Sequence, residues 1–235
     1  MRLRRHPPCR TWGHCAADRR PLRPNRVRAV IDHLVYATPD LDAAVEWVAA
    51  AVGVRPTPGG RHPGLGTRNA LLDIGDGAYL ELIGVDGQAA APPDGPRPFG
   101  LDRITEPRLA GWAAKASGID RCVARARAAG YDPGPVQSLS RRLPDGTELR
   151  WRLTFPGPHS VELIPFLIEW AEDAPHPSTT SPAGCRLVSF TGGHPEPVAV
   201  APVLRALGVE LAVVPATSAA LVAVIEGPGG TVQLS

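Results

Sequence analysis

The part of the sequence that decides the fold opens with Ile31-Asp32-His33-Leu34-Val35-Tyr36-Ala37-Thr38 and ends with Tyr79-Leu80-Glu81-Leu82-Ile83. Both runs are short, apolar and rich in β-forming residues, which predicts two strands. Alternation along the first strand places His33, Val35 and Ala37 on one face, with Asp32, Leu34 and Tyr36 on the other. His33 and Glu81 stand in otherwise apolar strands, and a buried polar side chain needs a partner.

A helix and a glycine-rich segment separate these two strands. Thr38 has the side chain of an N-cap, and Pro39 suits the first helical position. Apolar residues at helical spacing then predict a helix over 41–52, and Gly53 suits the left-handed position that closes it. The segment Gly59-Gly60-Arg61-His62-Pro63-Gly64-Leu65-Gly66-Thr67-Arg68-Asn69 predicts a loop whose glycines permit close backbone approach.

His33 and Glu81 face the same concave side if their strands lie in one sheet. Imidazole and carboxylate are common ligands of divalent metals. They are equally an acid–base pair. A buried His–Glu hydrogen bond with a purely structural role is the third interpretation, and the two residues by themselves leave all three open.

Residues 1–28 differ in composition from the rest of the chain. They carry nine arginines and one aspartate without apolar periodicity, which predicts a disordered tail or an upstream extension of the reading frame. A basic nucleic-acid-binding arm is the alternative. Without this segment the chain has 16 basic and 22 acidic residues. The overall pI therefore does not indicate a nucleic-acid partner.

Targeting signals and disulfide motifs are missing from the sequence. It contains neither an apolar run long enough to span a membrane nor the apolar region of a secretory signal, which predicts a soluble, cytoplasmic protein. Its four cysteines, at positions 9, 15, 122 and 185, form no Cys-x-x-Cys motif. They therefore imply no disulfide framework.

Helix-ending glycines recur at even spacing. Gly53, Gly130 and Gly208 are 77 and 78 residues apart, which predicts duplicated supersecondary units. In the second unit we expect a strand over 109–116, Ser117 as N-cap, and a helix over 119–129. A hairpin around Asp145-Gly146 and a last strand over 160–170, bent at Pro165, follow. Each of the first two units therefore reads strand–helix–strand–strand–strand.

The third unit follows a linker over 171–183 that is rich in Pro, Ser and Thr. Its predicted strands cover 186–190, 211–214, 221–226 and 231–234, with a helix over 198–207. Its first strand has Arg186 or Leu187 where the first unit has His33, and its last strand has Gln233 where the first unit has Glu81. Since the polar pair is lost, we interpret this unit as structural.

A repeated βαβββ unit with His in its first strand and Glu in its last resembles the vicinal oxygen chelate superfamily, and most closely its glyoxalase-like branch. The similarity rests on 32–37, the glycine-rich segment, 79–83 and Pro165-Phe166-Leu167-Ile168-Glu169-Trp170. It covers most of 31–180 and is specific for the fold rather than for the substrate. It implies an α+β fold in which paired βαβββ units form a cup-shaped curved sheet.

The resemblance also implies a divalent metal in the cup, held by side chains from first and last strands. His33 and Glu81 match two ligand positions, and Glu162 matches a third, with Glu169 as its rival if Pro165 shifts the register. The fourth position falls near Trp112, which is not a metal ligand. This departure leaves two alternatives, a metal site with three protein ligands and open positions, or a cup without metal. If a metal is bound, the ligand types do not distinguish among Zn, Fe, Mn, Ni and Mg.

The glycine-rich segment adds polar side chains close to the His33 strand. Thr67 and Asn69 are candidates for binding substrate oxygens, and His62 is a candidate proton shuttle. A surface turn with an exposed histidine is the alternative. Trp151, Phe166 and Trp170 are expected to supply apolar walls of the substrate site, or to be ordinary core.

These observations give one leading function and one alternative. The leading one is a metal-assisted lyase, isomerase or dioxygenase acting on a small oxygen-rich molecule, with Glu81 and His62 as catalytic residues. The alternative is a non-catalytic protein that binds a small molecule in a metal-free cup. The expected organisation is a tail over 1–28, a paired domain over 29–180 and a degenerate βαβββ module over 184–235. We expect a small-molecule ligand, neither nucleic acid nor membrane as partner, and pairing into a homodimer.

Overall fold

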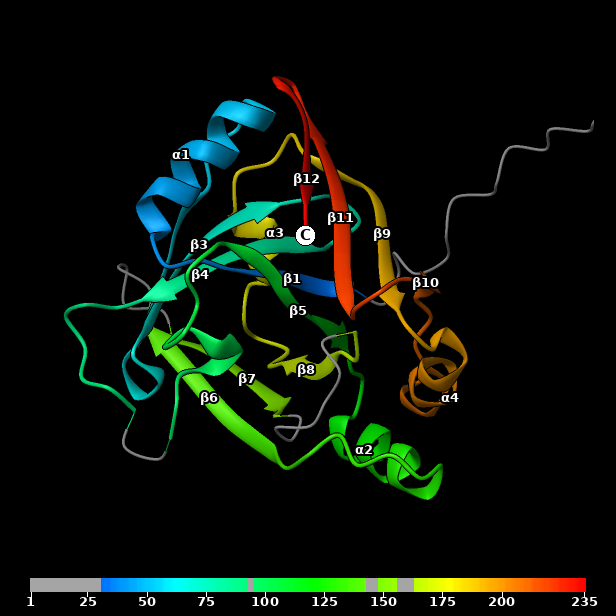
Figure 1. The fold of residues 1–235 in the computed structure, drawn as a ribbon. Helices are drawn as coiled ribbons and strands as arrows, with labels where there is room; N and C mark the ends of the chain where they lie inside the picture. Colours follow the sequence, from blue (N-terminus) through cyan, green and yellow to red (C-terminus); the bar gives the residue numbers. More distant parts are fainter. Residues whose placement is uncertain (1–30, 93–94, 143–147, 156–162) are drawn as a thin grey trace, which may run out of the picture.

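Two β-sheets with their flanking helices make up the part of the chain that the computed structural model describes, which is residues 31–92, 95–142, 148–155 and 163–235 (Figure 1). Strands and helices both contribute, as an α+β fold requires. The predicted tail, the Asp145-Gly146 turn and Glu162 lie outside the described residues. None of the described helices is long and apolar enough to cross a membrane.

The elements follow the predicted order closely. The first unit contains β1 (Ile31–Ala37), α1 (Leu41–Val52), β2 (Thr57–His62), β3 (Thr67–Asp73) and β4 (Tyr79–Val85). The second contains β5 (Arg108–Lys115), α2 (Ile119–Ala128), β6 (Val136–Arg142), β7 (Glu148–Thr154) and β8 (Phe166–Trp170). A short helix, α3 (Pro177–Thr180), leads to β9 (Arg186–His194), α4 (Pro197–Leu207), β10 (Ala212–Pro215), β11 (Ala220–Gly227) and β12 (Gly230–Leu234).

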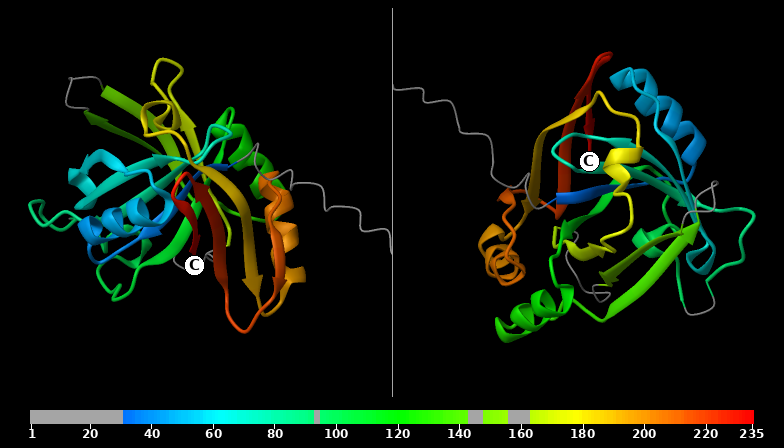
Figure 2. Two further views of the ribbon diagram at one scale, coloured as in Figure 1. Left: turned by 90° about the horizontal axis from the view of Figure 1, so that it is seen from above. Right: turned by 180° about the vertical axis from the view of Figure 1, so that it is seen from behind.

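The first two units share one eight-stranded sheet with the order β2-β3-β4-β1-β5-β8-β7-β6. This order is symmetric about the central pair, in which β1 and β5 run antiparallel. In each unit the first strand pairs with the last one in parallel, β1 with β4 and β5 with β8. The sheet curls strongly, so that its concave side forms a cup (Figures 1 and 2). The predicted duplication and the cup-shaped fold are therefore confirmed.

The start of α1 differs from the prediction by two residues. Asp40, rather than Thr38, is the N-cap, and its carboxylate accepts the backbone N–H of Ala43 at 3.0 Å. The Thr38 hydroxyl instead bonds the backbone of Asp40 and holds the turn before the helix. Gly53 closes the helix with φ of 75°, as predicted. Asp and Thr both cap helices well, so residue type alone does not decide which of the two positions is the N-cap.

The cap of α2 comes from a distant strand. Ser117 was the predicted N-cap, but Gly118 occupies that position and has no side chain to offer. The carboxylate of Glu169, at the end of β8, accepts the backbone N–H groups of Gly118 and Ile119 at 2.5 and 3.2 Å. A negative charge at a helix N-terminus also interacts favourably with the helix dipole. This contact is non-local, so sequence spacing did not reveal it.

The predicted glycine-rich loop is mostly strand. β2 ends at His62, a single turn follows, and β3 begins at Thr67, so the two strands form a hairpin. The glycines allow this because other residues pass very close to β2. A Cβ atom on Gly59 would stand 2.5 Å from Asn69 Oδ1, and one on Gly60, whose φ is 152°, would stand 2.7 Å from Arg141 Nη1.

The C-terminal unit forms its own four-stranded sheet with the order β10-β9-β11-β12. Its chain order matches that of the first two units, but its pairing differs, since β9 lies between β10 and β11 instead of pairing with the last strand. This sheet stands beside the curled one in Figure 2. Its last strand leads to Ser235, whose carbonyl accepts the N–H of Leu109 in β5 at 2.9 Å.

Buried apolar residues form two clusters on opposite sides of the curled sheet. The larger one joins the convex side to the helices and the second sheet, through residues such as Leu34, Trp112 and Phe190. The smaller one lies inside the cup and includes Val35, Trp151 and Phe166. Because one face of β1 serves each cluster, its alternating side chains are divided between them.

Candidate functional site

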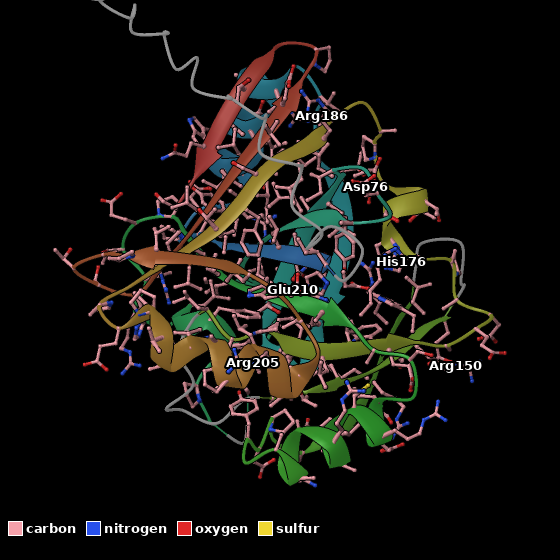
Figure 3. The ribbon with its side chains drawn as sticks, turned by 90° about the vertical axis from the view of Figure 1, so that its right-hand side faces the viewer. Asp76, Arg150, His176, Arg186, Arg205 and Glu210 are labelled. Atoms are coloured by element: carbon pink, nitrogen blue, oxygen red, sulfur yellow. The ribbon has the colours of Figure 1, made fainter. Side chains whose placement is uncertain are left out.

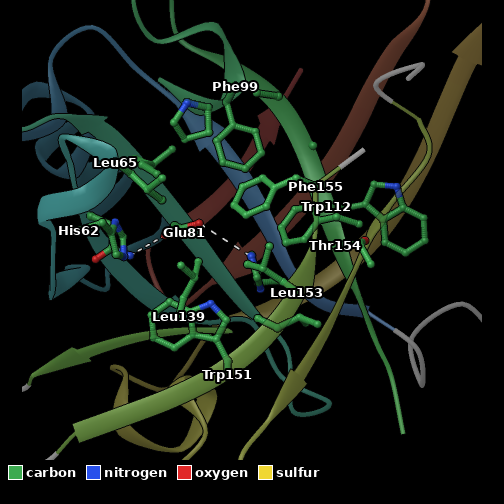
Figure 4. A pocket seen from close by; sticks show the side chains of 18 of the residues that line it. His62, Leu65, Glu81, Phe99, Trp112, Leu139, Trp151, Leu153, Thr154 and Phe155 are labelled. Carbon is green, nitrogen blue, oxygen red and sulfur yellow. Dashed lines mark hydrogen bonds and ion pairs between the residues drawn. The ribbon is translucent and has the colours of Figure 1, made fainter. Parts of the chain in front are cut away.

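The concave side of the curled sheet encloses a cavity of about 520 Å³ (Figure 4). Strands of both units line it, and its volume lies within the range of ordinary small-molecule sites. The polar side chains come mainly from the first unit: His33 on β1, His62 on β2, Asn69 on β3, and Tyr79 and Glu81 on β4. The structure therefore places the predicted polar residues around one cavity.

His33 and Glu81 meet at the centre of this group, as the alternation predicted. His33 Nε2 lies 3.8 Å from Glu81 Oε2, and both side chains are almost fully buried. Asn69 Nδ2 donates to the other oxygen, Glu81 Oε1, at 2.5 Å; Figure 4 draws both contacts as dashed lines. A separation of 3.8 Å is too long for a direct hydrogen bond. Nε2 and Oε2 can therefore each exchange a proton with a third group.

A buried carboxylate fixes the His33 ring from behind. Asp32 Oδ1 lies 2.8 Å from His33 Nδ1, and Asp32 also contacts Nε2 of His176 at 2.9 Å and Nε1 of Trp170 at 3.2 Å. Burial by itself would raise the pKa of Asp32, but the hydrogen bonds from His176 and His33 hold that pKa well below its usual range. An ionised carboxylate only accepts, so His33 carries a proton on Nδ1. In the neutral tautomer this leaves the lone pair of Nε2 directed into the cavity.

Asp32 is on the cup side because β1 is irregular at this point. Alternation predicted that it would share a face with Leu34 and Tyr36. The register of β1 against β5 shifts between Ile31 and His33, so strict alternation breaks there. A bulge of this kind re-aims a side chain. Sequence periodicity alone did not indicate this role for Asp32.

His62 and Thr67 form a second polar pair beside Glu81. His62 lines the cavity, while the Thr67 hydroxyl is fully buried behind it and lies 3.0 Å from His62 Nδ1. Thr67 thus orients His62 rather than lining the cavity itself. Burial lowers the pKa of His62; Glu81 counteracts this, and Arg141 adds to it. His62 is therefore neutral at pH 7 and can give or take a proton on its cavity side.

The second unit supplies the apolar part of the cavity wall. Trp151, Phe166 and Trp170 line it as predicted. The ring of Phe166 meets His33 edge-on at 5.4 Å, and Tyr79 stacks on the other side of that imidazole at 4.7 Å. These rings restrict the orientation of His33.

The second-unit carboxylate expected in the cup is not found among the described residues. Glu162 lies outside them, and Glu169 points away from the cavity to cap α2 and to contact Arg152. Trp112 borders the cavity, but its indole N–H donates to the carbonyl of Leu163 and its ring packs against Phe190 on the convex side. β5 therefore contributes no metal-binding side chain at this position.

The described residues fit a divalent metal only in part. His33 offers a nitrogen oriented by Asp32, which is how proteins hold a metal-ligating histidine, and Glu81 offers a carboxylate. Catalytic zinc sites use three protein ligands, and within the described ranges no group of three His, Cys, Asp or Glu side chains is placed to hold a metal. These residues alone therefore do not complete a metal site.

Several polar residues that line the cavity were not anticipated from the sequence, namely Arg103, Arg108, Arg141 and Thr154. Arg141, on β6, lines the cavity and is only 8% exposed. It lies across the backbone of Gly60 on the opposite outer strand, β2. The local sign of its position is that Leu139, two residues earlier on the same face of β6, also lines the cavity.

The sequence model of the glyoxalase-like domain family matches residues 31–208. Among curated proteins, none matches this sequence.

Solved structures share the fold more clearly than the sequence. A hypothetical protein from Staphylococcus aureus superposes with a TM-score of 0.58 at 14% identity, covering 86% of this chain and 83% of the other. Methylmalonyl-CoA epimerase from Mycobacterium tuberculosis is 26% identical, covering 60% of this chain and 88% of the other, with a TM-score of 0.41. The first likeness supports a common fold, and the second is too distant in structure to indicate an activity.

Proposed function

Since this chain belongs to the glyoxalase-like domain family, within the vicinal oxygen chelate superfamily, we propose that it is an isomerase or lyase that moves a proton on a small oxygen-rich molecule held in the cup. The observation that carries this proposal is the facing pair of His33 Nε2 and Glu81 Oε2, 3.8 Å apart in an enclosed cavity. Neither atom is occupied by a direct bond to the other, so both are available to a substrate.

His33 is the better base of the pair. Its Nδ1–H is held by Asp32, so the lone pair on Nε2 faces the cavity. In the proposed step this nitrogen takes a proton from a carbon next to a carbonyl group. The electron pair of the broken C–H bond moves to the carbonyl oxygen, and the positive charge formed on the imidazole is stabilised by Asp32.

Glu81 and His62 complete the proton transfer. Asn69 holds one oxygen of Glu81, which leaves Oε2 directed towards His33. After the first step, return of the proton to a neighbouring carbon completes an isomerisation, whereas loss of a leaving group that takes up the proton completes an elimination. Neutral His62, oriented by Thr67, can donate a hydrogen bond to the developing oxyanion.

The steps above use only side chains of this chain. His33 and Glu81 would be two ligands if a divalent metal were bound, and the metal would then act as a Lewis acid on the substrate oxygens. Glu162, the third ligand expected from the resemblance, lies outside the described residues, so the steps are derived from His33, Glu81 and His62 alone.

Exchange of carbon-bound hydrogen tests this proposal directly. The full chain is incubated in deuterium oxide with a panel of 2-oxo acids, 2-methyl-branched acids and α-hydroxyketones, and NMR follows loss of the proton next to the carbonyl. We expect exchange for at least one substrate class, its loss in His33→Asn and Glu81→Gln, and no change in the control Glu210→Gln. Glu210 is exposed, lies between α4 and β10, and is not among the residues that line the cavity (Figure 3). No exchange across the panel, or full exchange in His33→Asn, would contradict the mechanism.

A second candidate function is a non-catalytic binder, and the apolar lining of the cavity by Trp151, Phe155 and Phe166 favours it. Binding and turnover separate the two candidates. A binder retains its affinity in His33→Asn and never exchanges a carbon-bound proton. Removal of metal with a chelator before the assay adds a further comparison, since exchange by His33 and Glu81 alone persists after chelation.

A further inference from the structure

A positive charge is buried in the cup, and one of its nitrogen atoms has no hydrogen-bonding partner among the described residues. The guanidinium of Arg141 projects from β6 into the cavity, and Arg141 is 8% exposed. Its Nη1 atom has no hydrogen-bond partner among the described residues. Buried guanidinium groups are normally paired, because an isolated charge in low dielectric is unfavourable. The proposed mechanism does not use this group.

The backbone of β2 is shaped to admit this side chain. Arg141 Nη1 would lie 2.7 Å from a Cβ atom on Gly60, so any side chain at this position would displace the guanidinium from where it lies. The position also closes the cup, because β6 and β2 are the two outer strands of the curled sheet. Arg141 is therefore held between these strands with its guanidinium exposed to the cavity rather than to bulk water.

No carboxylate among the described residues is available to neutralise Arg141. Burial lowers the pKa of Arg141, and the nearby Tyr79 and Glu81 counteract this by raising it. However, the Glu81 oxygens are directed towards Asn69 and His33. A guanidinium presents five N–H donors in a planar fork that matches a carboxylate. The missing partner therefore has the chemistry of an oxyanion.

The rest of the cavity defines what such an anion would be attached to. Arg103 and Arg108 line the cavity as well. Leu139 lies two residues from Arg141 on the same strand and pairs with Trp151, and Leu153 and Phe155 also line the cavity. A wall of this kind suits hydrocarbon, and about 520 Å³ is too large for a simple inorganic anion. A cavity with a positive charge at one end and apolar surface beside it suits a ligand that is an amphiphilic acid.

We propose that Arg141 binds the carboxylate of an organic acid whose apolar part lies against Leu139, Trp151 and Phe155. This assignment rests on the proposed function in one respect, namely that the same cavity holds the substrate. It identifies the substrate class as monocarboxylic acids that carry an aliphatic or aromatic group. The carboxylate pairs with the buried guanidinium, and the carbon next to the reacting carbonyl lies towards His33 and Glu81.

Pairs of acids and their amides test the assignment without knowledge of the natural substrate. Phenylacetate, hexanoate and decanoate are titrated into the full chain in parallel with their primary amides, and binding is followed by calorimetry. The members of a pair differ in charge but hardly in shape. We expect at least one acid to bind about tenfold or more tightly than its amide, as a charge-assisted pair in a buried site predicts. If no acid binds better than its amide, including the case in which nothing binds, the assignment is wrong.

Variants test whether the preference for acids over amides depends on Arg141. Arg141→Met is expected to abolish the preference for acids, and Arg141→Lys, which keeps the charge but not the fork, to retain part of it. The control Arg150→Met removes an exposed arginine of β7 that pairs with Asp173 and lies on the outside of the cup (Figure 3); it should bind like the wild type. An unchanged preference in Arg141→Met would overturn the proposal.

Two control measurements separate effects on folding and on catalysis from effects on acid binding. Because Arg141 is unpaired without ligand, Arg141→Met should melt at the same temperature as the wild type or higher. The His33→Asn variant should keep the preference for acids while losing exchange activity. Loss of exchange with an intact acid preference therefore counts against the proposed function only, whereas exchange without an acid preference counts against Arg141 only.

Discussion

Replacement of Asp32 by asparagine is expected to move the proton of His33 from Nδ1 to Nε2. Asp32 faces three nitrogen donors, on His33, His176 and Trp170. An asparagine offers one acceptor oxygen and one donor amide, so one of the three nitrogens must become an acceptor. His176 is fixed, because its Nδ1 already accepts the N–H of Ser178, and an indole cannot accept. His33 is therefore the residue that changes tautomer.

The cost of this change follows from the number and burial of the bonds. Asp32 is 1% exposed, and a hydrogen bond to a buried charged group contributes about 1.5–3 kcal/mol. The substituted asparagine keeps weaker forms of two bonds and loses the charge from all three, so we expect a loss of about 3 kcal/mol. For a chain of this size that corresponds to a melting temperature lower by about 6–12 °C.

The difference in stability between Asp32→Asn and the wild type should depend on pH. The folded-state pKa of Asp32 lies well below its usual value. Its contribution to stability is therefore complete above the unfolded-state pKa of about 4 and is lost as the pH falls below that value. Melting curves at neutral and at acidic pH measure this directly, and the difference between the two proteins should shrink on acidification.

Long-range nitrogen–proton NMR correlations of the histidine rings report the tautomer, and melting curves report the stability. The control Asp120→Asn makes the same chemical change in an exposed ion pair with Arg152, and it should melt close to the wild type because such pairs contribute little. If Asp32→Asn melts with the wild type, or if His33 keeps its proton on Nδ1, Asp32 does not orient the base in the way described.

Three further predictions concern the framework around the cup. Glu169→Ala should lower the stability by about 1–2 kcal/mol in thermal denaturation, because α2 loses its cap, while acid binding is unchanged; an unchanged melting temperature would show that the cap contributes nothing. Gly60→Ala should displace Arg141 and reduce the preference for acids in calorimetry, whereas Gly64→Ala, whose Cβ would meet nothing within 4 Å, should not; equal behaviour of the two variants would speak against the role of Gly60. A chain that begins at Ala29 should melt at the temperature of the full chain, because residues 1–28 cannot bury enough apolar area to contribute; a clear drop would make the tail part of the fold.

Local patterns predicted the strands and the side chains that they direct into the cup. His33 and Glu81 were placed on one face by alternation alone, and their meeting at 3.8 Å follows from the parallel pairing of β1 and β4. The duplication was likewise predicted from the glycine spacing, and the cup from the resemblance, whereas the order of the strands was not predicted. In these cases a local period determines the direction of the side chain.

Features that depend on distant segments could not be predicted in this way. Arg141 belongs to the site because β6 meets β2 where the sheet closes, and no spacing within β6 reports this. Asp32 contacts His33 from behind, where the pairing of β1 with β5 is irregular. Glu169 was weighed as a metal ligand, but the start of α2 lies close enough to take its carboxylate. Each of these outcomes is decided by tertiary packing.

The two halves of the cup, although symmetric in strand order, have different kinds of lining. The first half supplies His33, Asn69 and Glu81, whereas β7 and β8 present mainly hydrocarbon, including Trp151 and Phe166. Such an asymmetric duplication makes the protein evolvable. Substitutions in one half can change which molecules fit while the other half keeps its reactive groups, so a library randomised at Leu139, Leu153 and Ile168 should yield new ligand preferences without rebuilding the chemistry.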